Sequence, residues 1–251
     1  MKIKEVEYKE WKLYYSEKDR VSMERIGKNI VDKNFEVIQT LKDTKRNYVA
    51  IIKINNIKYI LKELRSEIII PQRKIQTLVK KGEALTTLIN GLEAIDEGLI
   101  ELVKPLIALV KRGKMIEKSF ILMEYIEGKI LKNTKDIIEV IEVTKKFHNL
   151  GRYHGDLNTS NFLRTETGLR IVDTQMKKEK KLWFKRSNDI LILKEDLLVL
   201  ELKTEIDEYY PEIKEKRGYL LAKFFRKIKK LKLVECIREK KKQLRKKGWK
   251  I

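Results

Sequence analysis

Three short β-branched runs between residues 35 and 64 constrain the fold of this chain most strongly. They read FEVIQTL, YVAIIKI and IKYILKEL, and they are separated by KDTKRN and by Asn55-Asn56. Runs of this length predict β-strands, and an asparagine pair between two of them is typical of a tight hairpin turn. The N-terminal part of the chain is therefore expected to contain an antiparallel sheet.

The spacing of the apolar residues becomes helical after residue 72. Positions three and four apart predict a helix over residues 72–90, and SFILMEYI then predicts another strand. The segment DIIEVIEVTKKFHNLG predicts a second helix, which stops at Gly151 because glycine readily adopts the left-handed conformation after a helix. The order predicts an α+β protein, with a mostly β part followed by a mostly helical part.

Composition excludes several classes of protein. A hydrophobic fraction of 42% over 251 residues fits a globular protein rather than a disordered one. No run approaches the ~18 apolar residues of a membrane span, and MKIKEVEYKEWKLYY lacks the apolar core of a signal peptide. One cysteine, Cys236, excludes an intrachain disulfide and, with two histidines, disfavours a zinc site. We expect a cytoplasmic protein.

The net charge of +21 is concentrated at the C-terminal end. Residues 214–251 hold 17 Lys and Arg against 3 acidic residues. Apolar residues recur there at helical spacing among the cations, which predicts a basic amphipathic helix able to lie on an anionic membrane surface. The same apolar stripe would also suit packing on the helical part, so both interpretations stay open.

The segment RYHGDLNTSNFL, residues 152–163, is polar between two apolar runs. It is followed by a predicted hairpin, FLR-TETG-LRIV, whose turn lies near Thr167. Asn161 and Asp173 are symmetric about that turn, so we expect them within one residue of opposite positions. Two oxygen-bearing side chains side by side form a suitable site for a hard cation.

These residues belong to a larger pattern. Lys62 ends a strand, Glu83 lies on the following helix, Asp156 and Asn161 stand in His-Gly-Asp-x-x-x-x-Asn, and Asp173 follows the hairpin. In this order they resemble the protein-kinase-like phosphotransferases. The resemblance implies that Lys62 holds the ATP phosphates, that Glu83 positions Lys62, and that Asp156 orients the acceptor hydroxyl and accepts its proton. It also implies that Asn161 and Asp173 hold Mg²⁺.

Each residue taken alone has an ordinary structural explanation. Lys62 would be one exposed lysine among many, Glu83 a first-turn helix acid, and Asp173 the cap of a turn. His148 and His154 are expected to be structural rather than catalytic. The order and context of the whole set favour the kinase interpretation.

Two departures from the kinase pattern narrow the class. The loop Lys42-Asp-Thr-Lys-Arg-Asn47 has no glycine, so Lys42, Lys45 and Arg46 are expected to reach the phosphates by charge. Asp173 is followed by Thr-Gln rather than Phe-Gly, and no Ala-Pro-Glu appears. These differences disfavour a regulated protein kinase and favour the small-molecule and sugar kinases.

The segments LKDTKRNYV, NIKYILKEL, LVKKGEAL, ILMEYIEG, HNLGRYHGDLNTSNFL and GLRIVD are similar to those of bacterial lipopolysaccharide core heptose kinases, closest to the heptose(II) kinases. This resemblance covers residues 27–200. It implies ATP-dependent phosphorylation of an inner-core heptose on a lipid-linked oligosaccharide, at the cytoplasmic face of the inner membrane.

The same resemblance implies a protein-kinase-like bilobal fold. Its parts would be an N-terminal extension (1–34), an N-lobe of antiparallel sheet with one main helix (35–123), a hinge (124–128), a helical C-lobe (129–213) and the basic C-terminal segment (214–251). The adenine would lie against the hinge, with Met123 behind it and backbone groups of Glu124 and Ile126 beside it. Asp189 would brace the catalytic loop.

Two alternatives remain open from the sequence. The acceptor could be another core sugar, an aminoglycoside-type small molecule or a protein hydroxyl. The basic charge could instead indicate a nucleic-acid-binding or scaffold protein without enzyme activity. The tail has few aromatic residues to stack on bases and no recognition motif, which disfavours nucleic acid.

Overall fold

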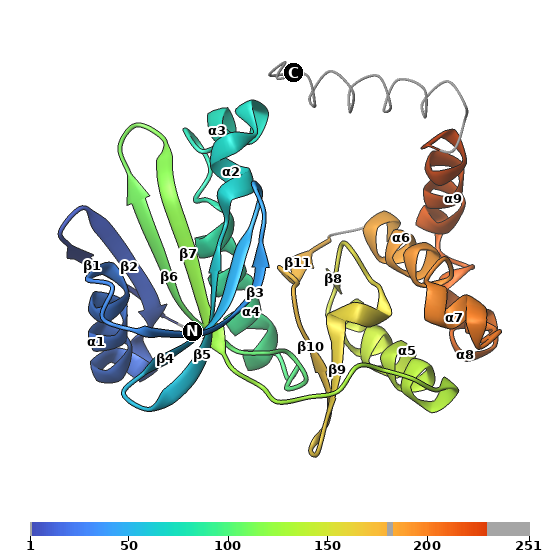
Figure 1. Cartoon of the computed structure of the whole chain (residues 1–251). Helices are drawn as coiled ribbons and strands as arrows, with labels where there is room; N and C mark the ends of the chain where they lie inside the picture. Colours follow the sequence, from blue (N-terminus) through green and yellow to red (C-terminus); the bar gives the residue numbers. More distant parts are fainter. Residues whose placement is uncertain (1, 180–182, 230–251) are drawn as a thin grey trace. The chain divides into compact units, whose positions relative to one another are not determined.

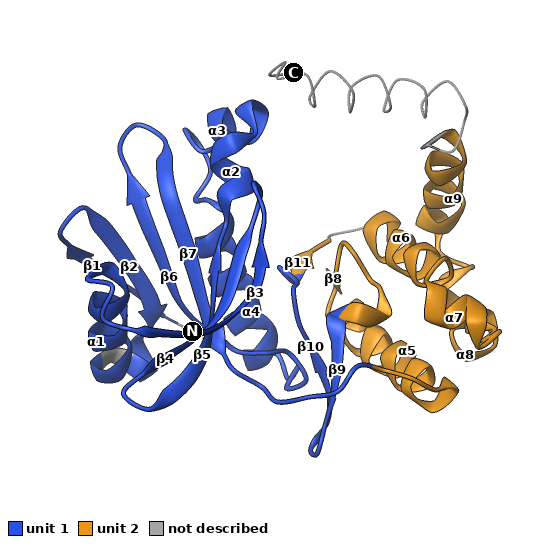
Figure 2. Cartoon of the chain, in the orientation of Figure 1, with its two compact units in different colours: residues 1–130, 161–176 blue, residues 131–160, 177–251 orange. Residues whose placement is uncertain are grey.

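A computed structural model of the chain describes residues 2–179 and 183–229. The chain divides into two compact units, one made of residues 1–130 and 161–176 and the other of residues 131–160 and 177–251 (Figure 2). Among the described residues, no helix combines the length and apolar character needed to span a bilayer.

The first unit is built on a seven-stranded antiparallel sheet of order β1-β2-β6-β7-β5-β4-β3, with β1 and β3 at its two edges (Figure 1). The strands are β1 (Ile3–Tyr8), β2 (Trp11–Ser16), β3 (Glu36–Asp43), β4 (Tyr48–Ile54), β5 (Ile57–Glu63), β6 (Pro105–Arg112) and β7 (Ile116–Glu124). The helices are α1 (Arg20–Val31), α2 (Arg65–Ile69), α3 (Pro71–Gln76) and α4 (Glu83–Asp96), with a 3₁₀ turn at Glu17–Asp19.

The sheet has a different apolar core on each face. Because side chains alternate along a strand, Leu61 of β5 points into a core with α1, whereas Ile60 packs on the core with α4. The two faces are therefore separated by the sheet, and neighbouring residues of one strand serve different environments.

The three strands predicted between residues 35 and 64 are confirmed as β3, β4 and β5. Asn55 and Asn56 both have positive φ, 49° and 67°, as expected for the two central residues of a tight hairpin turn. Residues 3–31, for which the sequence patterns predicted no element, form β1, β2 and α1.

The single helix predicted over residues 72–90 is wrong, because residues 77–82 separate α3 from α4. Gly82 immediately precedes α4 and has φ 89°, which no helix interior accommodates. A Cβ atom there would lie 2.4 Å from the Cδ1 atom of Ile116, so a larger residue would require the Ile116 side chain to shift.

The hairpin predicted after Asn161 is confirmed and belongs to the first unit. It consists of β9 (Phe162–Thr165) and β10 (Gly168–Ile171), which follow a 3₁₀ turn at Thr159–Asn161. The backbone of Ile171 bonds to both sides of residue 102: its oxygen accepts from Val103 N at 3.0 Å, and its nitrogen donates to Glu101 O at 2.8 Å. The predicted C-lobe range of 129–213 is thus divided between the two units.

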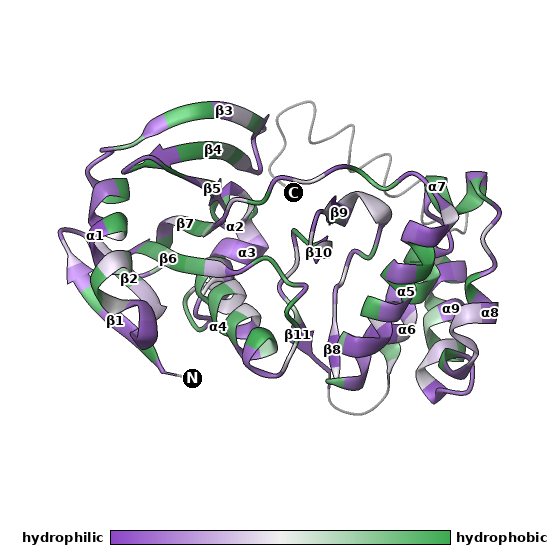
Figure 3. Cartoon of the chain, turned by 90° about the horizontal axis from the view of Figure 1, so that it is seen from below, coloured by the Kyte–Doolittle hydropathy of each residue, from purple (hydrophilic) through white to green (hydrophobic). Residues whose placement is uncertain are grey.

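The second unit is mostly helical. It contains α5 (Thr134–Asn149), β8 (Arg152–Tyr153), β11 (Lys177–Lys178), α6 (Phe184–Leu193), α7 (Leu197–Glu201), α8 (Ile206–Tyr209), a 3₁₀ turn at Pro211–Ile213 and α9 (Arg217–Lys229). The predicted helix that stops at Gly151 is confirmed as α5, and Gly151 has φ 71°. Figure 3 shows hydrophobic and hydrophilic bands along α5, as its amphipathic sequence predicts.

Candidate active site

Lys62 lies on β5 and follows Ile60 and Leu61, whose side chains point to opposite faces of the sheet. Alternation along the strand places its side chain on the same face as Ile60, the face that α4 covers. Its ammonium group forms an ion pair with the carboxylate of Asp173, a residue 111 positions later in the chain. The structure therefore brings these two predicted site residues together inside the first unit.

The hairpin of β9 and β10 places Asp173 beside Asn161. Phe162 is opposite Ile171, and the next pair outward is joined by a hydrogen bond from Val172 N to Asn161 O of 2.9 Å. Asn161 thus lies opposite Val172, one residue from Asp173, as the sequence predicted. Asp173 has φ 53°, an unusual conformation for a residue other than glycine.

Glu83 begins α4, and its backbone and side chain are held by different residues. Its N–H donates to Glu67 Oε1 at 2.8 Å, while its carboxylate accepts from Gln175 Nε2 at 2.8 Å and faces Arg73 Nη1 at 3.6 Å. Among the described residues Glu83 and Lys62 are therefore not paired with each other. Lys62 instead pairs with Asp173.

Three residues of this arrangement were not predicted from the sequence: Glu67, Arg73 and Gln175. Gln175 is the second residue of the Thr-Gln pair that follows Asp173 in place of Phe-Gly. Its hydrogen bond with Glu83 links that segment to α4. Glu67 is buried, and burial raises the pKa of its carboxyl. An unexpected acid in the apolar run RSEIII is the only sequence signal that points to it.

The glycine-free loop between β3 and β4 is closed by a threonine side chain. Thr44 Oγ1 accepts from the backbone N–H groups of Arg46 at 3.3 Å and Asn47 at 3.0 Å. Arg65 anchors the loop by donating from Nη1 to Thr44 O at 3.0 Å and to Asp43 Oδ1 at 2.6 Å. The turn therefore has a defined shape without glycine.

The three cations predicted for this loop are exposed. Lys42 lies on β3, and Lys45 and Arg46 lie in the turn. None of the three has an ion-pair partner within residues 2–179 and 183–229. Their charge is therefore not neutralised by the described part of the protein.

Residues 124–128, the segment predicted as the hinge, begin at the last residue of β7. Some of their polar groups form hydrogen bonds within the protein. Met123 is buried in the core beneath α4, and Ile126 packs against that core. The backbone N–H of Glu124 donates to Lys104 O at 3.0 Å. The Glu124 carboxylate accepts from Lys104 N at 2.7 Å and from Arg170 Nη2 at 2.6 Å. The amide of Glu124 is thus already engaged.

In the second unit, two carboxylates hold the loop that carries Asp156. Asp189 accepts from His154 N at 2.6 Å and from Gly155 N at 2.9 Å, so the predicted brace is confirmed. Asp196, which was not predicted from the sequence, accepts from both the backbone N and the Oγ1 of Thr159 at 2.9 Å. Asp156 itself is exposed, on a loop fixed at both ends.

The two histidines are buried, which agrees with their predicted structural roles. His148 is fully buried between Tyr210, whose hydroxyl lies 3.3 Å from Nδ1, and Asp189, whose Oδ2 lies 3.5 Å from Nε2. Burial lowers the pKa of His148 despite the nearby carboxylate. A neutral imidazole is therefore expected there at neutral pH.

Comparison with known proteins identifies the family. Residues 2–231 match the family described as lipopolysaccharide core biosynthesis protein (WaaY). The chain belongs to this family. WaaY proteins are a kinase family, so the chain is related to phosphotransferases and to lipopolysaccharide core synthesis.

A second similarity covers about half of this WaaY family member. The chain is 32% identical, over 127 residues or 49% of its length, to a probable bifunctional tRNA threonylcarbamoyladenosine biosynthesis protein of Methanobrevibacter smithii. The matched region spans only 22% of that archaeal protein.

The residues of the first unit fit a magnesium ion of the kind that kinases use. Among the described residues, no three His, Cys, Asp or Glu side chains cluster as a complete metal site. Mg²⁺ in such enzymes is held by one or two protein oxygens together with substrate phosphates and water, so a complete protein cage is not required. Asp173, with 58% of its side chain exposed, and Asn161 supply oxygens of the right kind.

Proposed function

We propose that this protein is an ATP-dependent phosphotransferase that phosphorylates a heptose of the lipopolysaccharide inner core. The observation that carries the proposal is the pairing of Lys62 with Asp173 in a chain of the WaaY family. A cation from a central strand and a carboxylate beside an asparagine are the groups that phosphoryl transfer requires of a protein.

We further propose a protein-kinase-like bilobal arrangement for the chain, with residues 35–123 as N-lobe, 124–128 as hinge and 129–213 as C-lobe. The sheet with α4 packed on one face supports the N-lobe assignment. The helices α5 to α8 support the helical C-lobe. ATP is then expected on the face of the sheet that carries Lys62.

In the proposed reaction Lys62 binds the α- and β-phosphates of ATP, and Glu83 exchanges Arg73 for Lys62 when the nucleotide binds. Lys42, Lys45 and Arg46 neutralise phosphate charge from the loop side. The carbonyl of Glu124 and the N–H of Ile126 receive the adenine, in front of Met123. The Glu124 carbonyl is the group left for this purpose because its amide donates to Lys104.

Asp156 accepts the proton of the acceptor hydroxyl as the hydroxyl oxygen forms its bond to the γ-phosphorus. The bond between that phosphorus and the β–γ bridging oxygen breaks, and ADP leaves. A magnesium ion held by Asn161 and Asp173 would supply positive charge to the β- and γ-phosphates. The defined shape of the Asp156 loop supports this role, since positioning is most of the catalysis in phosphoryl transfer.

The decisive experiment supplies purified protein with Mg²⁺, γ-labelled ATP and core oligosaccharides that carry or lack each heptose phosphate. We expect transfer to one unphosphorylated heptose and a loss of about 10²- to 10⁴-fold in rate for Asp156→Ala. Asp207→Ala, which removes an ion-paired acid of the same unit, serves as the control and should retain activity. Transfer that does not depend on Asp156 would contradict the mechanism.

The same assay distinguishes the alternative acceptors. Label on a different core sugar, on an aminoglycoside or on a protein would retain the kinase chemistry and change the substrate. The similarity to the archaeal tRNA-modification protein adds tRNA-associated proteins to the panel. Nucleic-acid binding with a steep salt dependence and without any transfer would instead support the non-enzyme interpretation.

We also propose that α9 attaches the protein to the anionic cytoplasmic face of the inner membrane. Tyr219 and Ala222 are buried, whereas Leu220 and Phe224 are 71% and 59% exposed beside Lys223 and Lys227. One side of the helix thus packs internally, and the other presents apolar and cationic groups together. Residues 230–251, which complete the predicted basic segment, lie outside the described residues.

Sedimentation with phosphatidylglycerol vesicles tests this attachment. Lys223→Glu/Lys227→Glu is expected to weaken vesicle binding at least about thirtyfold, since each of the two cations near an anionic surface contributes ~1 kcal/mol and the new carboxylates are repelled by it. Lys132→Glu/Lys135→Glu, at two exposed lysines near the start of α5, is the matched control and changes binding less. Equal vesicle binding by all three proteins would exclude α9 as the attachment site.

A further inference from the structure

The first unit contains a cavity of 340 Å³ on the face of the sheet opposite Lys62. Leu61 and Glu63 line it, and these residues alternate with Lys62 along β5. The cavity is therefore separated by the sheet from the proposed ATP site. Its volume lies in the range of small-molecule sites, about 300–1,000 Å³.

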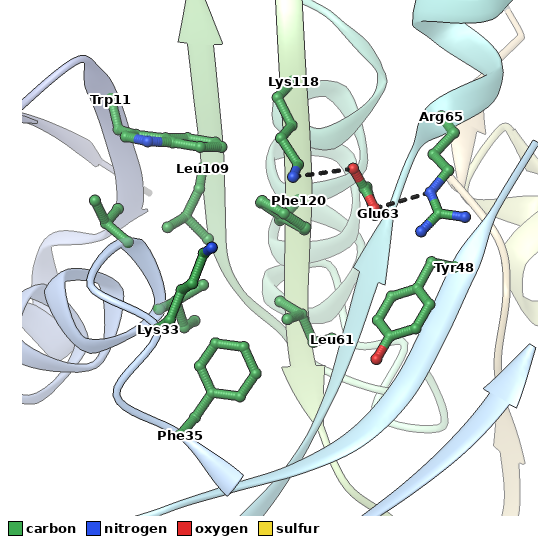
Figure 4. Close-up of a pocket in the computed structure, with 12 residues that line it drawn as sticks. Trp11, Lys33, Phe35, Tyr48, Leu61, Glu63, Arg65, Leu109, Lys118 and Phe120 are labelled. Atoms are coloured by element: carbon green, nitrogen blue, oxygen red, sulfur yellow. Dashed lines mark hydrogen bonds and ion pairs between the residues drawn. The ribbon is translucent and has the colours of Figure 1, made fainter. Parts of the chain in front are cut away.

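The walls of the cavity are apolar and largely aromatic (Figure 4). Trp11 and Phe120 stack with ring centroids 5.5 Å apart, and they form one wall. The remaining apolar lining comes from α1, from the connection between α1 and β3, and from the sheet: Ile30, Val31, Phe35, Tyr48, Leu61 and Leu109.

Charged residues at the cavity are paired with one exception. Glu63 accepts from Arg65 Nε at 2.9 Å and faces Lys118 Nζ at 3.5 Å, as the dashed lines in Figure 4 show. Lys33 has no ion-pair partner within the described ranges 2–179 and 183–229. Figure 4 shows its side chain extending between Trp11 and Phe35. The cavity thus offers one uncompensated cation among aromatic rings.

The backbone of Lys33 is in a conformation that lysine rarely adopts. It follows α1 with φ 60°, and Lys33 N donates to Ile30 O at 3.2 Å while Asn34 N donates to Asn29 O at 2.8 Å. This is the Schellman ending of a helix, in which glycine is the usual residue. Lysine at this position costs stability relative to glycine, so a substitution to glycine is compatible with the backbone.

We propose that this cavity binds a small amphiphilic anion, with the apolar body against Trp11, Phe35 and Phe120 and the anionic group at Lys33. A cation that is otherwise unpaired gains a charge-assisted bond from such a ligand, and the aromatic walls bury its apolar part. A carboxylate on a short hydrocarbon chain and the headgroup of an anionic lipid share this chemistry.

The test measures binding of decanoate, decanol and decyltrimethylammonium by calorimetry, below their micelle concentrations. Decanoate is expected to bind at least about tenfold more tightly than the other two, because only it pairs with Lys33. Lys33→Gly should weaken decanoate binding about tenfold and, because glycine suits the backbone, should raise Tm.

The chain contains a matched control for this substitution. Lys203 follows α7 with φ 50°, and the same two bonds recur: Lys203 N donates to Leu200 O at 3.2 Å and Thr204 N to Val199 O at 3.1 Å. Lys203→Gly should raise Tm in the same way and leave decanoate binding unchanged. Equal decanoate affinity for wild type and Lys33→Gly, or equal affinity for decanoate and decanol, would overturn the proposal.

Vesicles distinguish the two sources of the anion. If Lys33→Gly also loses affinity for phosphatidylglycerol vesicles but not for phosphatidylcholine vesicles, the ligand is a lipid headgroup with its chain. If it loses affinity for decanoate alone, the ligand is a free single-chain anion. Neither result depends on kinase activity, so the proposal stands or falls separately from the proposed function.

Discussion

Asp189 accepts the backbone N–H of His154 with a donor–acceptor distance of 2.6 Å. The other oxygen of the same carboxylate accepts from Gly155, so one buried side chain satisfies two consecutive amides of the loop before Asp156. A carboxylate is the only common side chain with two acceptor oxygens and no donor, which explains why an acid is needed at this position.

We therefore expect Asp189→Asn to destabilise the second unit and loosen this loop. One amide would face the NH₂ group of asparagine, and a buried unsatisfied donor costs about 1–3 kcal/mol. Urea unfolding gives the stability, and hydrogen exchange at His154 and Gly155 reports the loop. Glu142→Gln, which breaks an exposed ion pair with Lys145 in the same unit, is the control and should cost about 0–1 kcal/mol. Unchanged exchange at both amides would show that Asp189 does not hold the loop.

Gly82→Ala is expected to lower the free energy of unfolding by about 3 kcal/mol or more. The variant would combine an unfavourable positive φ with a Cβ atom 2.4 Å from Ile116. Gly98→Ala separates the two effects, because Gly98 has φ 101° and a Cβ atom added there would meet nothing within 4 Å. We expect that control to cost only about 1 kcal/mol. Equal losses would mean that the contact with Ile116 relaxes freely.

The contribution of Glu67 to the free energy of unfolding should fall as the pH rises, whereas an ion-paired carboxylate shows the opposite dependence. Burial raises the pKa of this carboxyl above its ordinary value of 4.5, so the folded protein holds the proton more tightly than the unfolded chain. The resulting stability is complete below pH 4.5 and is lost as the pH rises through the folded pKa.

Glu67→Gln removes this dependence and keeps an oxygen to accept the N–H of Glu83. We expect the variant to gain stability relative to wild type at pH 7 and to lose that advantage near pH 4. Unfolding by urea at both pH values measures the difference. Glu201→Gln, at an exposed position in α7, should show no such change between the two pH values. An advantage that grows toward pH 4 would contradict the assigned direction of the pKa shift.

Lys45→Gln/Arg46→Gln is expected to raise KM for ATP several-fold with little change in kcat. Both side chains are exposed, so each would contribute about 0.5–1 kcal/mol to phosphate binding, and salt would screen the effect. Steady-state kinetics at 50 and 300 mM salt should show the largest difference from wild type at low salt. Lys114→Gln, in the turn between β6 and β7, controls for a general loss of charge; an equal rise in KM there would remove the special role of the loop.

The sequence was informative where local patterns determine structure. The β-branched runs and the Asn55-Asn56 pair specified β3 to β5, and the symmetry about Thr167 placed Asn161 within one residue of the position opposite Asp173. These relations depend on residues close in the chain, so spacing and turn chemistry suffice to predict them.

Long-range partners were harder to predict. Glu83 was correctly placed on a helix, but its partners Arg73 and Gln175 depend on how α3 and the segment after β10 pack, which no periodicity records. The break before Gly82 was missed because the apolar spacing continues across it, and the steric reason lies 34 residues away at Ile116.

The turn from Thr44 to Asn47 reaches its shape through a hydroxyl group and through Arg65, and none of its four residues has positive φ. Positions 45 and 46 therefore impose no backbone requirement on the amino acid they carry. A glycine-rich phosphate-binding loop does not tolerate such changes in amino acid, since most substitutions of its glycines would distort the backbone. If the loop covers ATP as proposed, its side chains are free to diversify, which would make it a natural place to alter nucleotide preference in evolution or in the laboratory.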